Sequence, residues 1–151
     1  MSKQCAVILD MDGTLADVSG IRHFVRPTAE RKRKDFDAFH AESVNVPAHA
    51  HVVKIARDAH AAGIAVLIVT ARRARWRNHS AMWLALNGVP SDALFMRADD
   101  DHRKDFDVKA DILARIRQTW NPVLAVDDNP AVIALWEREG IPTHIVPGWE
   151  D

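Results

Sequence analysis

The sequence has one cysteine, no tyrosine and no long hydrophobic run among its 151 residues. The single cysteine, Cys5, excludes an internal disulfide framework and a four-cysteine zinc site, and it is typical of a reducing cytoplasm. No apolar stretch approaches the roughly 18 residues that a membrane span needs. The stretch that follows Met1–Gln4 is also too short for a signal peptide. We therefore expect a cytoplasmic protein without a membrane partner, with Cys5 as a small core residue in the first apolar run.

The chain also lacks an excess of charge of either sign. Its 20 basic and 21 acidic side chains give a formal net charge of −1, which excludes a nucleic-acid binder whose whole surface is basic. Residues 22–34 nevertheless carry +5 and residues 72–77 carry +4, so the rest of the chain carries −10. These two basic segments suit contacts with phosphodiesters. Two solvated helix faces would have the same composition, and the charge alone leaves both interpretations open.

Short apolar runs that end in polar residues predict a buried parallel sheet of about five strands. The runs cover residues 5–9, 64–69, 93–96, 123–126 and 143–146. Helical periodicity lies between them, at residues 48–62, 76–87, 105–118 and 130–138. Strands that alternate with helices imply right-handed βαβ crossovers. We therefore predict an α/β fold in which residues 1–151 form a single domain.

Residues 20–46 interrupt this alternation with a densely charged segment. We expect a small basic excursion above the sheet, with one charged helix at about residues 28–42 that packs through Phe36 and Phe39. A solvated loop and helix without a role is the alternative. Pro47 suits the first turn of the next helix, and Gly63 suits its end.

Polar residues follow three of the predicted strands, where parallel sheets bind their ligands. They are Asp10 and Asp12 after the first strand, Thr70 after the second, and the pair Asp127 and Asp128. Two carboxylates about 4 Å apart repel by several kcal/mol at an effective dielectric constant near 20, so a cation must offset the cluster. Oxygen ligands beside an anionic substrate favour Mg²⁺ over Ca²⁺. Ordinary aspartates at strand ends would explain any one of these residues, but not the set.

The first of these strand ends has residues suited to phosphoryl transfer. Asp10, directly after a buried strand, can act as a nucleophile that forms an aspartyl-phosphate. Asp12, two residues later, can act on the same ligand as general acid and base. Gly13 permits a tight turn and a close approach of the backbone to an anion.

Lys109 is a charged residue on the apolar stripe of the predicted helix 105–118. It precedes Ile112, Leu113 and Ile116 at helical spacing, and Asp105 lies on the same stripe one turn earlier. Charges on an apolar face are costly unless they are paired or functional. We expect Lys109 to point into the site and offset the charge of Asp10; a lysine that snorkels at the helix edge is the alternative.

Four segments together resemble the motifs of the haloacid dehalogenase superfamily, most members of which are Mg²⁺-dependent phosphotransferases. Asp10-Met11-Asp12-Gly13-Thr14 resembles the first motif and Val69-Thr70-Ala71-Arg72 the second. Lys109 matches the third motif and Asp127-Asp128 the fourth, in the expected order. The resemblance implies a three-layer Rossmann-like fold with a minimal cap or none. It also implies catalytic and metal-binding residues, which are Asp10, Asp12, Thr70, Lys109, Asp127 and Asp128, with Asp12 reaching the metal through its backbone carbonyl.

Nearly the whole chain is also similar to the 3′-phosphatase domain of bacteriophage polynucleotide kinase, through residues 97–109 and the sequence that follows Asp127. This resemblance implies that four further residues bind substrate, namely Arg22, Arg72, Arg97 and Asp105. His23 and Arg26 compete with Arg22 for its role. No Gly-x-x-x-x-Gly-Lys-Ser/Thr phosphate loop occurs in these residues. We therefore expect either a stand-alone phosphatase or a module whose kinase or ligase partner is on another chain.

The sequence thus predicts a Mg²⁺-dependent phosphomonoesterase that removes the 3′-phosphate from DNA or RNA ends. The short excursion favours an open site for a chain end, and Trp76 between Arg75 and Arg77 is a candidate for stacking a nucleotide. A nucleotidase or another small-molecule phosphatase of the same superfamily is the first alternative. A non-catalytic module that binds ends or partners is the second.

Overall fold

Five parallel strands form one sheet in a computed structural model that describes residues 2–25 and 35–149. The strands are β1 (Gln4–Leu9), β2 (Ala65–Arg73), β3 (Ala93–Arg97), β4 (Trp120–Asp127) and β5 (Thr143–Ile145). Their order across the sheet is β3-β2-β1-β4-β5, and every neighbouring pair is parallel. The predicted α/β architecture is confirmed.

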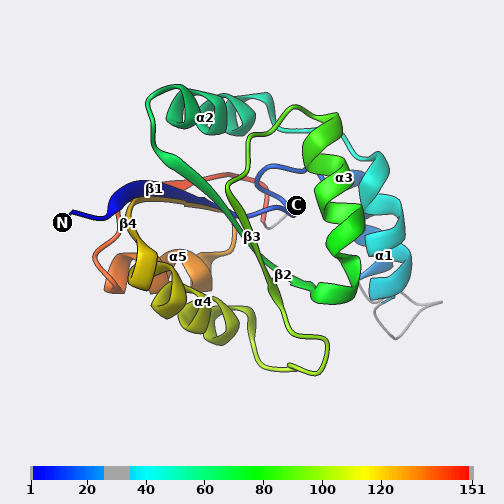
Figure 1. The fold of residues 1–151 in the computed structure, drawn as a ribbon. Helices are drawn as coiled ribbons and strands as arrows, with labels where there is room; N and C mark the ends of the chain where they lie inside the picture. The colour runs from blue at the N-terminus through cyan, green and yellow to red at the C-terminus, as the bar shows by residue number, and fades with distance from the viewer. Residues whose placement is uncertain (1, 26–34, 150–151) are drawn as a thin grey trace.

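Helices cover both faces of this sheet and make the fold three-layered (Figure 1). The α-helices are α1 (Phe36–Glu42), α2 (Ala50–Ala61), α3 (Arg77–Leu86), α4 (Asp105–Thr119) and α5 (Pro130–Arg138). The short 3₁₀ helices are η1 (Ser19–Phe24), η2 (Ser43–Asn45) and η3 (Ala74–Trp76). Helices α4 and α5 lie on one face, while α2 and α3 lie on the other, with α1 outside α3 (Figure 1).

Alternating side chains of the central strand build the two cores. Val7 and Leu9 pack on the side of α2 and α3, whereas Ala6 and Ile8 pack on the side of α4 and α5. Because both faces are buried, β1 is a continuous apolar run rather than an alternating one. The burial of both faces thereby holds the carboxyl end of β1 in place, at the point where the chain leaves the sheet.

Chain order reverses between β1 and β4, which creates a topological switch point. From β1 the chain proceeds to β2 and β3 on one side, and it returns to β4 and β5 on the other. In open parallel sheets the ligand crevice lies beyond the carboxyl ends of the strands at such a point. Asp10 and Asp127 stand at those two strand ends.

The excursion between β1 and α2 contains only short helices among the described residues, namely η1, α1 and η2. Helix α1 begins at Phe36 because the Asp35 carboxylate accepts a hydrogen bond from the Ala38 backbone N–H at 3.0 Å. The expected helix at residues 28–42 is therefore shorter within the described part, and residues 26–34 lie outside the described residues. The expectation of a minimal cap agrees with these elements.

Three local expectations were wrong. Strand β2 continues past Thr70 to Arg73, because Arg73 pairs with Arg97 after a register shift. Pro47 lies before α2 rather than in its first turn, and its carbonyl accepts the Asp17 N–H at 2.8 Å. Cys5 is exposed, since the first two residues of β1 lie outside the core.

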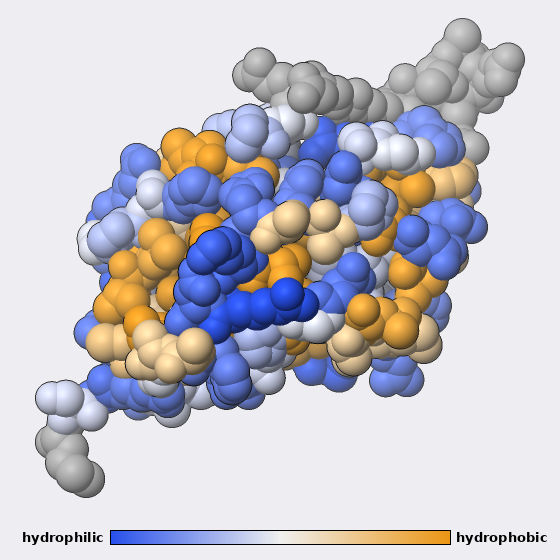
Figure 2. Space-filling view, turned by 90° about the horizontal axis from the view of Figure 1, so that it is seen from above, coloured by the Kyte–Doolittle hydropathy of each residue, from blue (hydrophilic) through white to orange (hydrophobic). Residues whose placement is uncertain are grey.

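Hydrophilic side chains cover most of the face seen from above, where the orange areas are small and separated (Figure 2). Helix α2 is amphipathic: Val52 and Ala56 are buried, whereas Lys54 and Asp58 form an exposed ion pair at 2.6 Å. Within the described part of the chain, no helix has the length and hydrophobicity of a membrane span.

Candidate active site

The candidate active site lies where β1 and β4 end side by side. Leu9 pairs with Val126, and the Asp10 N–H donates to the Val126 carbonyl at 3.0 Å. Asp10 and Asp127 therefore leave neighbouring strands at the same height, and both are buried. The sheet places the first and fourth sequence motifs together although more than a hundred residues separate them.

Lys109 joins these two carboxylates. Its Nζ lies 3.0 Å from Asp10 Oδ1 and 2.8 Å from Asp127 Oδ2, and its side chain is only 3% exposed. Lys109 belongs to the buried stripe of α4 with Val108 and Ile112. The stripe thus carries Lys109 into the site, as its helical spacing predicts, and not to the edge of the helix.

Burial and mutual repulsion shift the titration of this cluster. Burial, followed by the negative charge of Asp127, raises the pKa of Asp10 well above its usual value. The same two causes raise the pKa of Asp128 to about 6. Burial alone would lower the pKa of Lys109, but Asp10 and Asp127 outweigh it and raise that pKa. The single lysine therefore does not balance the three carboxylates.

The three buried carboxylates fit a divalent cation. Asp10, Asp127 and Asp128 each offer an oxygen, and these oxygens lie within 4.8 Å of one another. Hard oxygen donors with excess negative charge are the ligands that Mg²⁺ and Ca²⁺ take. A cation there would favour the ionised carboxylates and reverse the upward pKa shifts.

The carboxylates of Asp127 and Asp128 have different surroundings. Asp127 Oδ1 accepts the N–H groups of Asp128 and Asn129 at 2.9 and 3.0 Å, while its Oδ2 accepts Lys109. The donor contacts of Asp128 among residues 2–25 and 35–149 are longer, with Thr14 Oγ1 at 3.4 Å and Arg22 Nη2 at 3.6 Å. Asp128 thus keeps more free capacity for a ligand, whereas Asp127 is held by three donors.

Gly13 and Thr14 shape the turn against Asp128. Gly13 has φ +80°, and a Cβ atom built on it would lie 2.0 Å from Asp128 Oδ2, so only glycine fits. The Thr14 hydroxyl lies 3.1 Å from Asp10 Oδ2. The sequence analysis assigned no role to Thr14, although its place in the first motif was a usable signal.

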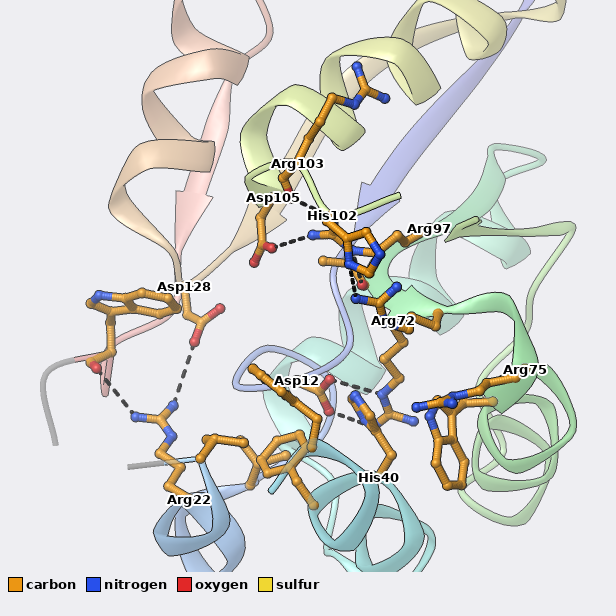
Figure 3. Close-up of a pocket in the computed structure, with 18 residues that line it drawn as sticks. Asp12, Arg22, His40, Arg72, Arg75, Arg97, His102, Arg103, Asp105 and Asp128 are labelled. Carbon is orange, nitrogen blue, oxygen red and sulfur yellow. Dashed lines mark hydrogen bonds and ion pairs between the residues drawn. The ribbon is translucent and has the colours of Figure 1, made fainter. Parts of the chain in front are cut away.

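Asp12 points away from the other three carboxylates and pairs with Arg72. Arg72 Nε donates to Asp12 Oδ2 at 2.9 Å, and Nη2 donates to Oδ1 at 2.5 Å (Figure 3). Burial raises the pKa of Asp12, but the charge and hydrogen bonds of Arg72 outweigh it and hold the pKa below its usual range. The side chain of Asp12 is therefore not part of the metal cluster; the expected contact was its backbone carbonyl.

Arg72 itself is buried and held by a serine that the sequence analysis missed. Arg72 Nη1 donates to Ser80 Oγ at 3.0 Å, and Ser80 is fully buried on α3. The backbone N–H of Arg72 donates to Thr70 Oγ1 at 3.2 Å. Thr70, also buried, thus fixes the backbone at the point where β2 enters the site.

Arg97 and Asp105 form a second fixed pair on the same rim. Arg97 Nη2 donates to Asp105 Oδ1 at 2.8 Å, and Nε donates to the Ala71 carbonyl at 2.9 Å. Nη1 reaches the carbonyls of Asp101 and Arg103, so Arg97 ties the loop before α4 to the end of β2. Asp105 is half exposed, in contrast to the deeply buried Lys109.

Arg22 reaches the site from η1 on the opposite side. Besides its contact with Asp128 (Figure 3), its Nη1 donates to the Gly148 carbonyl at 2.5 Å. His23, its competitor from the sequence analysis, is exposed, and Arg26 lies outside the described residues. All four expected substrate-binding residues line one cavity of about 490 Å³ together with Asp12 and Asp128.

Comparisons with known proteins agree with this geometry. The sequence model of a family described as "Polynucleotide kinase PNKP phosphatase domain" matches residues 4–147. A chain of a Pnkp1/Rnl/Hen1 complex superposes with a TM-score of 0.81 at 25% identity, and the match covers 97% of this chain and 47% of that chain. A second such chain, from a Pnkp1/Rnl/Hen1 RNA repair complex, has the same TM-score and identity, with coverages of 95% and 42%.

A more distant structure shares the fold alone. The Class C acid phosphatase from Bacillus anthracis, determined with tungstate bound, superposes with a TM-score of 0.75 at 16% identity over 100% of this chain and 69% of that one. The chain thus covers less than half of the two Pnkp1 complex chains and about two thirds of the acid phosphatase.

The fold and the aspartate–lysine site define a phosphatase of the haloacid dehalogenase class, as the motifs predict. Within that class, the chain belongs to the family of polynucleotide kinase PNKP phosphatase domains.

Proposed function

We propose that this chain, acting as one domain, is a Mg²⁺-dependent phosphomonoesterase that removes the 3′-phosphate from polynucleotide ends. The observation that carries the proposal is the position of Lys109 between Asp10 and Asp127 at the end of β1 and β4. It supports phosphoryl transfer because the proposed nucleophile Asp10, the ammonium group of Lys109 and a cluster of carboxylates that could bind a metal ion lie together in a phosphatase of this family.

Asp10 is the proposed nucleophile. One of its carboxylate oxygens forms a bond to phosphorus, and the bond from phosphorus to the 3′-oxygen breaks. Asp12, which must carry a proton at this step although Arg72 favours its ionised form in the free site, donates that proton to the 3′-oxygen. Water then attacks the aspartyl-phosphate, Asp12 takes up a proton from the water, and inorganic phosphate and free Asp10 result. The 3.0 Å contact with Lys109 holds the Asp10 carboxylate in place for the attack.

The Asp10 and Asp128 side chains, with the Asp12 carbonyl, are the proposed ligands of Mg²⁺, and Asp127 orients them. The free capacity of Asp128 supports this division, since Asp127 is already held by Lys109 and two backbone N–H groups. When bound, Mg²⁺ supplies positive charge to the phosphoryl oxygens and the carboxylates.

Five residues are proposed to bind or balance the phosphoryl group and its ester, namely Arg22, Thr70, Arg72, Arg97 and Lys109. Arg72 also orients Asp12 through its two hydrogen bonds. Asp105 keeps Arg97 in position through their 2.8 Å ion pair. These contacts support electrostatic stabilisation, which carries most of the catalysis in phosphoryl transfer.

Three observations support a polynucleotide over a small ester. The described excursion between β1 and α2 has only short helices, and Arg72, Arg73 and Arg75 of the basic segment 72–77 line the cavity. The similar chains come from Pnkp1/Rnl/Hen1 complexes, one of which is described as an RNA repair complex. We extend this to propose a cytoplasmic role in nucleic-acid repair, beside a kinase or ligase.

The test compares release of phosphate from 3′-phosphorylated DNA, 3′-phosphorylated RNA and nucleoside 3′-monophosphates with and without Mg²⁺. We expect kcat/KM to be at least about tenfold higher for the oligonucleotides, and this advantage should fall as salt rises because phosphodiester contacts are screened. Equal or faster turnover of the mononucleotides, insensitive to salt, would identify a nucleotidase instead.

A further inference from the structure

The cavity of about 490 Å³ at the active site has two unlike ends. Asp12, Arg72 and Asp128 line the charged end (Figure 3). The second group of lining residues, the aromatic end, comprises Phe36, Phe39, His40 and Trp76, while Trp149 lines the cavity beside Arg22. The cavity is larger than a phosphoryl group needs and falls within the range of roughly 300–1,000 Å³ of small-ligand sites. Phosphoryl transfer accounts only for the charged end.

His40 is the central residue of the aromatic end. It is 9% exposed, and its ring stacks on Phe36 at a centroid distance of 6.3 Å and an interplanar angle of 21°. Its Nδ1 is shielded from solvent and has no hydrogen-bond partner among the described residues. Burial lowers the pKa of His40 to about 4, so the imidazole is neutral at neutral pH although Asp12 lies nearby. A neutral ring can both stack and form hydrogen bonds.

Trp76 lies on η3, next to His40, and its ring nitrogen also lacks a hydrogen-bond partner among the described residues. The two ring centroids are 5.6 Å apart, and Trp76 Nε1 is shielded from solvent. The buried Trp83, in contrast, donates from Nε1 to the Val46 carbonyl at 2.9 Å. Trp136 of α5 also lacks a partner among the described residues, but it lies in the core and does not line this cavity. The signal is therefore the coincidence of two ring residues that line one cavity and each hold an unpaired nitrogen behind the ring surface.

Arg75 adds a positive charge to this wall. Its guanidinium carbon lies 5.7 Å from the centre of the Trp76 ring, and its Nη2 is 2.6 Å from Asp37 on α1. The contact joins η3 to α1 and so connects the two elements that carry Trp76 and His40. A wall of aromatic faces, unpaired ring nitrogens and one arginine matches a heteroaromatic base on an anionic chain.

We propose that His40 and Trp76 form a subsite for the nucleoside that carries the 3′-phosphate. The base stacks on these rings, and its polar edge pairs with their free nitrogens after a rotation of the rings about χ2. The chemical step fixes where the nucleoside lies, because its 3′-oxygen must be within reach of Asp12. His40 lies beside the Asp12–Arg72 pair, so it is next to that nucleoside (Figure 3). This inference rests on the proposed function, since a nucleoside reaches the wall only when its 3′-phosphate occupies the charged end.

The test uses two oligonucleotides of the same sequence, both with a 3′-phosphate. One has a complete terminal nucleoside, and the other has an abasic sugar at that position. We expect the wild-type protein to prefer the complete end by about tenfold to a hundredfold in kcat/KM, the range that base stacking supplies. In His40→Leu and Trp76→Leu this preference should fall to within about threefold of unity, and His60→Leu, an exposed histidine at the end of α2, should keep it.

Each outcome bears on one proposal. Equal turnover of the two ends by the wild-type protein, or an unchanged preference in both variants, would overturn the nucleoside subsite. The wild-type measurement decides this even where a variant does not fold. Release of phosphate from small esters but from neither oligonucleotide would instead overturn the polynucleotide function. Trp76→Phe, which keeps a stacking face without Nε1, should retain part of the preference.

Discussion

The charged and the aromatic ends of the cavity are built by different means. The charged end lies beside the last residues of two buried strands, where Lys109 contacts both Asp10 and Asp127 within 3.0 Å. The aromatic end stands on two short helices, α1 and η3, where His40 and Trp76 keep unpaired nitrogens. The comparison teaches that the groups proposed for the chemical step are fixed by the core, whereas the rings proposed to contact the nucleoside lie on the excursion and a turn.

Asp10→Asn should have the largest effect on the charged end. An amide cannot form the aspartyl-phosphate, so we expect kcat for release of a 3′-phosphate to fall by at least about a thousandfold. Asp107→Asn, at an exposed position in the first turn of α4, is the matched control and should retain full activity. Activity of Asp10→Asn within tenfold of the wild type would show that Asp10 is not the nucleophile.

Lys109→Met tests whether the charged end is also a structural unit. Removal of one partner from a buried ion pair costs about 3–5 kcal/mol, because Asp10 and Asp127 are left without a counter-charge. Urea unfolding without divalent metal should show this loss, whereas Lys104→Met, at an exposed lysine, should change the free energy of unfolding by less than about 0.5 kcal/mol. A loss below 1 kcal/mol for Lys109→Met would mean that protonation of the carboxylates replaces the lysine.

Most of the charged end could be predicted from the sequence because its signals are local. Asp10 and Asp127 follow buried apolar runs, and Lys109 interrupts an apolar stripe with a charge. Strand ends and helix stripes translate directly into positions in a parallel sheet. The five strands, the helices of the crossovers and the meeting of the motifs follow from the same patterns.

The position of His40 and the supports of Arg72 and β2 were harder to predict because their contacts join distant segments without a periodic pattern. Nothing in the sequence around His40 indicates that its ring would lie beside Asp12, and Ser80 gives no sign that it holds Arg72. The extension of β2 beyond Thr70 likewise depends on pairing with Arg97. Tertiary pairing of this kind is set by packing rather than by local propensity.

Binding of Mg²⁺ should stabilise the charged end in a pH-dependent way. The pKa of Asp128 is raised to about 6 from 3.8, so between these values the folded protein binds more protons than the unfolded chain. The metal-free protein should therefore lose stability as the pH rises through this range. Mg²⁺ requires the ionised carboxylates, so at a hundredfold excess over its Kd it should raise Tm by about 5–10 °C at pH 7.5.

At pH 5 the same Mg²⁺ concentration should raise Tm by less than half as much, because protons compete for Asp128. Calorimetry with and without MgCl₂ at both pH values measures the difference. Asp128→Asn should remove most of the Mg²⁺ effect, and Asp111→Asn, at an exposed position of α4, should leave it intact. An equal shift at both pH values would place the Mg²⁺ site away from these carboxylates.

The ion pair of the aromatic end should be worth far less than that of the charged end. Arg75 and Asp37 approach to 2.6 Å, but their side chains are 52% and 70% exposed, in contrast to 3% for Lys109. Exposed pairs of this kind contribute about 0–1 kcal/mol, because water screens them and two flexible side chains must be ordered. A double-mutant cycle with Asp37→Asn and Arg75→Gln should therefore give a coupling free energy below about 1 kcal/mol in urea unfolding. A coupling of 2 kcal/mol or more would mean that α1 and η3 are held as rigidly as the strand ends, and the contrast between the two ends would then be one of chemistry alone.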